Sequence, residues 1–176
     1  MHRSPAIMPQ SMDPAPPDGA AVGDIRDRLR ADHEATLADA QRLRSEDDAK
    51  RALHLLAALR RAWVIHALAE ETVVYRALEG AEGGPFAGTR SYERFVEHEL
   101  VESLFSKLAR LRPGSQEWSA RLNVARDLIA RHIESEHEDL FARLARSFDA
   151  AALAELGRRF DSARDKLALL EDAKAA

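Results

Sequence analysis

The segment HALAEETVVYRAL, residues 66–78, decides how the rest of the sequence is interpreted. It has the apolar content of a buried helix, yet it carries His66 and, four residues later, Glu70. Positions i and i+4 share one face of a helix, so the imidazole and the carboxylate are expected to point together. When buried, such a pair needs a hydrogen-bond partner or a metal ion to offset its desolvation. The segment therefore predicts a core helix with a polar, functional face.

The composition limits the classes of protein to consider. The chain has 176 residues, 45% hydrophobic and 32% charged, which suits one helical domain with a real core. A net charge of -4 argues against a nucleic-acid partner. Cysteine is absent, so any metal must be held by nitrogen and oxygen ligands. No apolar stretch has the length of a transmembrane helix or a signal peptide, so we expect no membrane association and a cytoplasmic location.

Helical periodicity dominates the chain after residue 20. Asp24 and Ser115 are candidate N-caps, and Ser45 with Asp48 forms a capping-box signature before the second helix. Short connections between long helices favour antiparallel neighbours. We therefore predict an all-α fold, an up-down-up-down four-helix bundle with an additional C-terminal helix. The expected helices cover residues 24–43, 47–79, 90–111, 116–146 and 149–170.

The same patterns divide the chain into three parts. Residues 1–22 contain five of the seven prolines and are predicted to be a disordered tail. Residues 23–146 form the predicted bundle, and residues 147–176 form a C-terminal helical extension. We expect the extension to pack against the bundle or to mediate self-association, which leaves a homodimer open.

Five of the seven histidines are distributed in an ordered way. Each of the four bundle helices contributes one histidine to a regular series, and His33, His66, His98 and His132 recur every 32 to 34 residues. In an up-down bundle, such intervals return the chain to a similar height, so these side chains are expected in one layer of the core. Three of the helices also carry an acid four residues later, at Glu70, Glu102 and Glu136. Solvated helix faces do not explain this combination.

Imidazole and carboxylate ligands suit iron, zinc and manganese. Several ligands of both types suit two ions, because carboxylates can bridge them, and bundle cores are where such dimetal sites are built. The pattern thus favours a metal site, with a purely structural or signalling bundle as the rival. A histidine phosphotransfer bundle needs a single exposed histidine, whereas this chain offers a cluster.

The order of these motifs, H33, H66-x-x-x-E70, H98-x-x-x-E102 and H132-x-x-x-E136-H137, resembles the hemerythrin, or HHE cation-binding, family. The resemblance spans about residues 24–146. The segments HALAEETVVYRAL and HIESEHEDLFARL are similar to the family's H-x-x-x-E-E-x-x-x-Y/F-P-x-L pattern, with Arg76 and Ala142 where the family usually has proline.

The resemblance implies a non-haem centre of two iron ions with an oxo or hydroxo bridge. His33, His66, His98 and His132 match its histidine positions, and Glu70 matches a bridging carboxylate. Two positions depart from the oxygen-carrying members. Glu102 stands where those members have a second histidine, and His137 stands where they have an aspartate or glutamate.

The ligand on the last bundle helix is left open between two neighbours. On an ideal α-helix, Glu136 lies about 40° from His132 and His137 about 140° away. This geometry favours Glu136 as the bridge, with His137 as a ligand or an outer partner. The candidate metal ligands are therefore His33, His66, Glu70, His98, Glu102, His132, Glu136 and His137, and we assign no catalytic residue.

The resemblance implies a di-iron protein that binds or senses dioxygen, nitric oxide or peroxide. The runner-up is a di-iron enzyme that consumes peroxide or nitric oxide, or an iron-handling protein. The sequence leaves open whether the chain is an enzyme.

Overall fold

The computed structural model describes residues 23–83 and 89–175, so the tail predicted at 1–22 lies outside the described residues. The helices are α1 (Ile25–Arg44), α2 (Ala49–Ala69), α3 (Arg76–Glu82), α4 (Thr89–Leu108), α5 (Gln116–Ser135), α6 (Phe141–Ser147) and α7 (Ala150–Ala175). A π-helical segment, η1 (Glu70–Tyr75), joins α2 to α3, and another, η2 (Glu136–Leu140), joins α5 to α6. The described residues therefore form five continuous helical rods and no strand.

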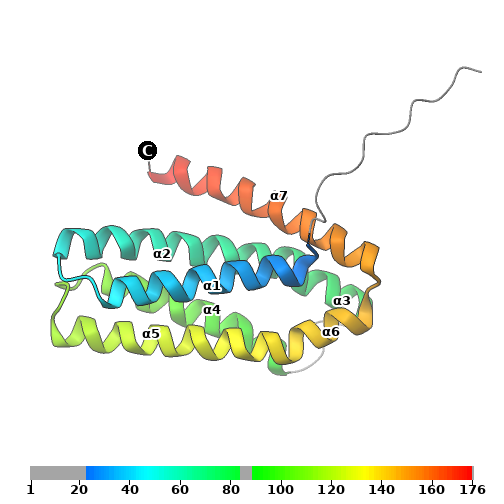
Figure 1. Ribbon diagram of the computed structural model, residues 1–176, viewed down its shortest axis with the longest axis horizontal. Coiled ribbons are helices and arrows are strands. Elements are labelled where there is room, and N and C mark those ends of the chain that lie inside the picture. Colours follow the sequence, from blue (N-terminus) through cyan, green and yellow to red (C-terminus); the bar gives the residue numbers. More distant parts are fainter. Residues whose placement is uncertain (1–22, 84–88, 176) are drawn as a thin grey trace, which may run out of the picture.

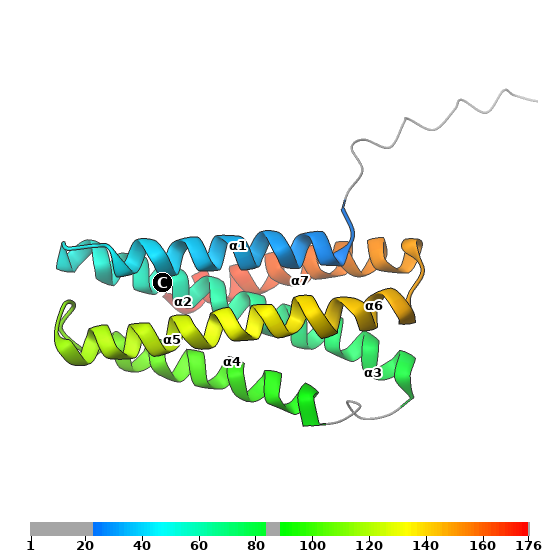
Figure 2. The same ribbon diagram turned by 60° about the horizontal axis from the view of Figure 1, so that its bottom comes forward.

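Four of the rods form an antiparallel bundle, and the fifth lies outside it (Figures 1 and 2). Within the bundle α1 contacts α2 and α5, and α4 contacts both α2 and α5, which closes the ring. The C-terminal helix α7 runs back along α1 and α2. The predicted all-α bundle with an additional C-terminal helix is confirmed.

The helix ends follow the capping residues, with one difference. Asp24 and Ser115 cap α1 and α5 as expected. Ser45 instead ends α1, because its backbone N–H bonds the carbonyl of Gln41 at 3.2 Å. The N-cap of α2 is Asp48, whose carboxylate accepts a backbone N–H from the first turn at 2.8 Å. The signature S-x-x-D thus contains the stop of one helix and the start of the next.

Both π-helical segments begin at the glutamate of an H-x-x-x-E pair, at Glu70 and at Glu136. A π turn takes an extra residue, so it changes which side chains face the core, and such turns are frequent at functional sites. The sequence analysis predicted unbroken helices here, because apolar periodicity does not distinguish a single π turn from the α-helix around it.

The apolar core is divided into two clusters. One lies toward the α1–α2 and α4–α5 connections and includes Leu59, Trp63 and Phe105. The other lies toward α3, α6 and α7 and includes Leu29, Tyr75 and Phe160. Along each bundle helix the buried histidine falls at the boundary between the two clusters. A polar layer therefore crosses the middle of the bundle.

The rod from Ala49 to Glu82 is, among the described residues, one helix whose length and apolar composition would suffice to cross a membrane. In the structure it contacts α1, α4 and α7 and carries buried His66 and Glu70. A core helix of a bundle passes the same test, and this is the role that the rod has here.

Replacing Phe105 with alanine should lower the free energy of unfolding by about 3–5 kcal/mol, because its fully buried ring would leave a cavity. Equilibrium unfolding in denaturant measures this change. Leu169→Ala is the control, since Leu169 is 71% exposed and should change stability by less than about 0.5 kcal/mol. Equal effects of the two substitutions would contradict the described core.

Candidate metal centre

Six polar side chains from the four bundle rods meet in the layer between the two apolar clusters. Each of them is at most 3% exposed. They are His33 from α1, His66 and Glu70 from α2 and η1, His98 from α4, and His132 and Glu136 from α5 and η2.

The two carboxylates lie among the imidazoles. The Oε2 atom of Glu70 is 3.7 Å from Nε2 of His66, 3.6 Å from Nε2 of His98 and 4.0 Å from Nε2 of His132. The Oε2 atom of Glu136 is 3.2 Å from Nε2 of His33 and 3.4 Å from Nε2 of His132. One ligand atom from each of His66, Glu70, His132 and Glu136 fits within a mutual distance of 4.8 Å. These atoms are spaced as a metal ion requires.

The imidazoles form two pairs. The rings of His33 and His66 have centroids 5.0 Å apart, and those of His98 and His132 have centroids 4.6 Å apart, with their Nε2 atoms at 3.1 Å. Glu70 and Glu136 each approach members of both pairs. Two imidazoles on each side of shared carboxylates is an arrangement that suits two bridged ions.

Several inward-facing atoms make no hydrogen bond of acceptable geometry, although Nε2 of His33 and Oε2 of Glu136 lie 3.2 Å apart. They are Nε2 of His33, Nε2 of His66, Oε1 of Glu70 and Oε2 of Glu136, all fully buried. An unsatisfied buried polar atom costs about 1–3 kcal/mol, so native proteins rarely leave four of them together. A cation would serve as the partner of all four, and the donor set therefore fits a metal centre.

The outer nitrogens of the imidazoles are held by polar side chains. Nδ1 of His66 lies 3.3 Å from Asp32, that of His98 2.7 Å from Glu71, and that of His132 2.9 Å from Glu97. A carboxylate can only accept, so each Nδ1 donates its proton outward and each Nε2 faces inward, where it presents a lone pair once it carries no proton. This is the orientation that a metal-binding histidine needs.

Tyr75 links the two central carboxylates. Its hydroxyl oxygen lies 2.7 Å from Oε1 of Glu136 and 3.0 Å from Oε2 of Glu70. Burial, together with the charges of Glu136 and Glu70, raises the pKa of Tyr75 well above its usual value, so the hydroxyl stays protonated. The buried guanidinium of Arg94, which donates to Asp139 at 2.9 Å, places a positive charge 3.9 Å from Glu136.

Without a metal, the layer holds protons. Burial raises the pKa of Glu70 well above its usual value, and the neighbouring charge of Glu136 adds to this. Burial also opposes the charge on His132, but Glu136 outweighs it and raises the pKa of His132 to about 10. His66 differs, because burial lowers its pKa to about 4. A cation must therefore displace protons from Glu70 and His132.

Two of the candidate ligands lie outside the cluster. Glu102 is half-buried and accepts from Arg60 at 2.6 Å and from Ser106 at 3.2 Å. Glu102 lies in the groove facing α2, and α4 has no π segment after His98, whereas Glu70 and Glu136 are the first residues of π segments. The structure thus does not bring Glu102 into the cluster, and its role as a ligand stays a prediction.

His137 has an exposed side chain, and its Nε2 lies 3.0 Å from Nδ1 of His33. Of the two alternatives left open on the last bundle helix, the structure places Glu136 in the cluster and His137 outside it. His137 therefore has the position of an outer partner, comparable to that of Asp32 behind His66.

Several residues around the centre were missed by sequence reasoning. Asp32 and Glu97 immediately precede His33 and His98, and each holds the histidine of another helix. Acids directly before these histidines, in ADHEA and VEHEL, are the signal that could have identified them. Tyr75 resembles an ordinary apolar core residue in the sequence, and its contact with Glu136 joins residues 61 positions apart.

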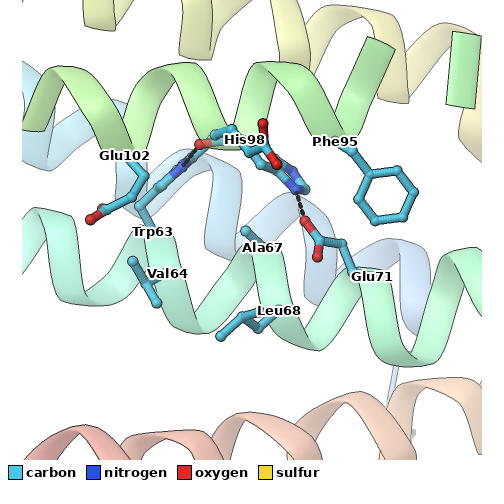
Figure 3. Close-up of a pocket in the computed structure, with 9 residues that line it drawn as sticks. Trp63, Val64, Ala67, Leu68, Glu71, Phe95, His98 and Glu102 are labelled. Atoms are coloured by element: carbon cyan, nitrogen blue, oxygen red, sulfur yellow. Dashed lines mark hydrogen bonds and ion pairs between the residues drawn. The ribbon is translucent and has the colours of Figure 1, made fainter. Parts of the chain in front are cut away.

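A pocket of about 300 Å³ opens between α2 and α4 beside His98 (Figure 3). Its lining is mostly apolar and includes Trp63, Ala67, Leu68 and Phe95. The Trp63 ring also contacts three of the imidazoles, at centroid distances of 5.4 to 6.0 Å. The pocket therefore reaches the edge of the polar layer.

The fold and the donor set together define a helical cation-binding domain. The family model of the hemerythrin HHE cation-binding domain matches residues 24–144, and the chain belongs to this family. The structure is similar to the crystal structure of a hemerythrin HHE cation-binding domain-containing protein from Mycobacterium kansasii, with a TM-score of 0.70 and 18% identity. That match covers 83% of this chain and 88% of the other, and it shows a shared fold. A search of curated proteins gives no match.

Cation binding should release protons, because the metal-bound state needs neutral imidazoles and ionised carboxylates. At about pH 7, His132 carries a proton before the cation binds. We therefore expect cation binding to release about one proton per chain from His132, and more if Glu70 also loses its proton. Affinity should then rise as pH rises toward the pKa of His132. Calorimetry with Zn²⁺ in buffers of different ionisation enthalpy measures the release. An affinity independent of pH would contradict the described protonation.

The placement of the acids predicts unequal effects of two matched substitutions. Glu136→Gln should remove a central ligand and reduce the metal content of the purified chain. Glu102→Gln, which breaks only the contacts with Arg60 and Ser106, should leave the metal content unchanged. Elemental analysis measures both variants, and a loss of metal in Glu102→Gln would restore Glu102 as a ligand.

Proposed function

We propose that this chain is a non-haem di-iron protein that binds or senses dioxygen or a related small molecule such as nitric oxide or peroxide. The observation that carries the proposal is the pair of buried carboxylates, each approaching both pairs of imidazoles. Nitrogen and oxygen ligands suit iron, and shared carboxylates suit two ions. When bound, two iron ions would supply electron transfer to a small ligand.

In this proposal, His33 and His66 hold one ion and His98 and His132 hold the other. Glu70 and Glu136 would lie between the two ions and share them. Because Glu102 and His137 stand apart, the protein offers only two imidazoles to each ion. That leaves room for an exogenous ligand on both sides and supports sensing or reaction over simple oxygen carriage.

The surrounding residues have distinct tasks. The two apolar clusters keep water from the layer, which strengthens every electrostatic interaction inside it. Tyr75 keeps its proton between the two carboxylates and fixes their orientation. The pocket beside His98 is mostly apolar, and we propose it as the approach for a small uncharged molecule.

A second candidate is a di-iron enzyme that consumes peroxide or nitric oxide. The observation in its favour is the protonated hydroxyl of Tyr75, a proton donor at the centre itself. Steady turnover with an electron donor would distinguish this enzyme from a sensor. Iron handling is a third use of the same ligands, and release of iron to a chelator would identify it.

The cellular setting is also proposed. A cytoplasmic location, with neither a nucleic-acid partner nor a membrane, agrees with the slightly acidic composition. A homodimer is proposed through the exposed Leu169 and Leu170 of α7.

Metal analysis of protein purified anaerobically and in air tests the di-iron proposal, with an optical spectrum of each form. We expect about two irons per chain, with near-ultraviolet bands of a bridged ferric pair that change on reduction and on exposure to oxygen. His66→Ala provides a comparison variant and should lose iron. Zinc alone, or no metal after anaerobic reconstitution with iron, would refute the proposal.

A further inference from the structure

The C-terminal helix α7 lies beyond the family match, which ends at residue 144. Its first half is anchored by apolar burial. Leu153, Leu156 and Phe160 belong to the apolar cluster that lies toward α3, α6 and α7. Between residues 161 and 173 no side chain is buried. Figure 1 shows this second half rising away from α1 and α2. Ala163 and Leu167 pack against the same cluster only in part, so polar contacts help to hold this half in place.

Three arginine contacts attach α7 to the bundle. Arg28 of α1 donates to Asp161 at 2.6 Å, and the same arginine crosses the backbone of α7 at Gly157, where an added Cβ would meet its Nη1 at 3.0 Å. Arg61 of α2 donates to Asp172 at 2.7 Å, near the end of the helix. The third contact runs in the opposite direction, from an arginine of α7 into the bundle.

That third contact reaches the metal centre. Nη1 of Arg164 forms an ion pair with Oδ1 of Asp32 at 2.9 Å, and the other oxygen of the same carboxylate accepts from Nδ1 of His66 at 3.3 Å. Phe160, one helical turn earlier, meets the His66 ring edge to face at a centroid distance of 6.1 Å. Asp32 is only 13% exposed at its side chain, so the cation from α7 compensates a largely buried charge. The outer partners of His98 and His132, Glu71 and Glu97, have no such ion pair with α7 among the described residues.

We infer that Arg164 is a positioning residue for His66, acting through Asp32, and that docking of the second half of α7 and cation binding by the His33–His66 pair strengthen each other. The inference rests on the proposed two-ion function. With one carboxylate oxygen held by Arg164, the other faces His66 and fixes its Nε2 inward. When α7 lifts, Asp32 is free to turn to solvent and the imidazole loses its orientation.

The coupling is reciprocal by thermodynamic necessity. A cation on the His33–His66 pair holds the His66 ring, which holds Asp32 toward Arg164, and this favours the docked helix. The degree to which the second half of α7 is docked thus depends on whether a cation is bound at the His33–His66 pair. This links the metal centre to the protein surface.

Stepwise Fe²⁺ binding to the full chain, measured anaerobically by competition with a chelator, tests the inference. Arg164→Gln should weaken one of the two binding steps by about 3- to 10-fold and leave the other unchanged, since loss of an outer partner typically weakens metal binding. Arg164→Lys keeps the charge toward Asp32 and should restore most of the affinity. Arg158→Gln, the matched control, breaks only an exposed ion pair with Glu155 inside α7 and should keep both affinities within about twofold.

Hydrogen exchange provides the reciprocal measurement. Fe²⁺ loading should slow amide exchange over residues 161–170 in the unmodified chain and not in Arg164→Gln. Equal affinities in Arg164→Gln and the unmodified chain would overturn the inference while leaving the di-iron proposal standing. So would a loss that falls on both binding steps or is matched by Arg158→Gln. If the unmodified chain binds fewer than two ions, the proposed function fails, and the inference fails with it.

Discussion

The structure depends on keeping two carboxylates, Glu70 and Glu136, ionisable inside an otherwise apolar bundle. Two such charges side by side in a protein interior repel each other and lose their hydration, so each needs compensation. Four imidazoles, a tyrosine hydroxyl and one buried guanidinium provide part of it in the metal-free chain. A bound cation would compensate the inward nitrogen and oxygen atoms of the histidines and glutamates that make no hydrogen bond.

The two central carboxylates coincide with changes in backbone winding. Two rods change from α to π winding at the residue where the carboxylate must face inward. In α4, where the winding is unchanged, the corresponding Glu102 faces a groove and pairs with Arg60. The same H-x-x-x-E spacing therefore gives a central carboxylate in two helices and a peripheral ion pair in the third.

This contrast explains which features the sequence could predict. Apolar periodicity and the capping residues Asp24 and Ser115 predict helices and their order, because both depend on neighbours close in sequence. The regular recurrence of histidines predicts one layer, because bundle helices of similar length return to similar heights. The roles of Tyr75, Glu102 and Arg164 depend on local winding and on contacts between distant helices. A one-dimensional pattern does not contain that information.

The polar layer also has a consequence for how the chain tolerates change. It separates the apolar interior into two compartments that share few contacts, one near the α4–α5 connection and one beneath α7. Substitutions in separate compartments are expected to combine additively, since coupling between mutations requires contact or a shared cavity. The residues of each apolar compartment can therefore be substituted independently while the residues of the polar layer stay unchanged. A lineage could remodel the compartment beneath α7 to suit new partners without altering the ligands.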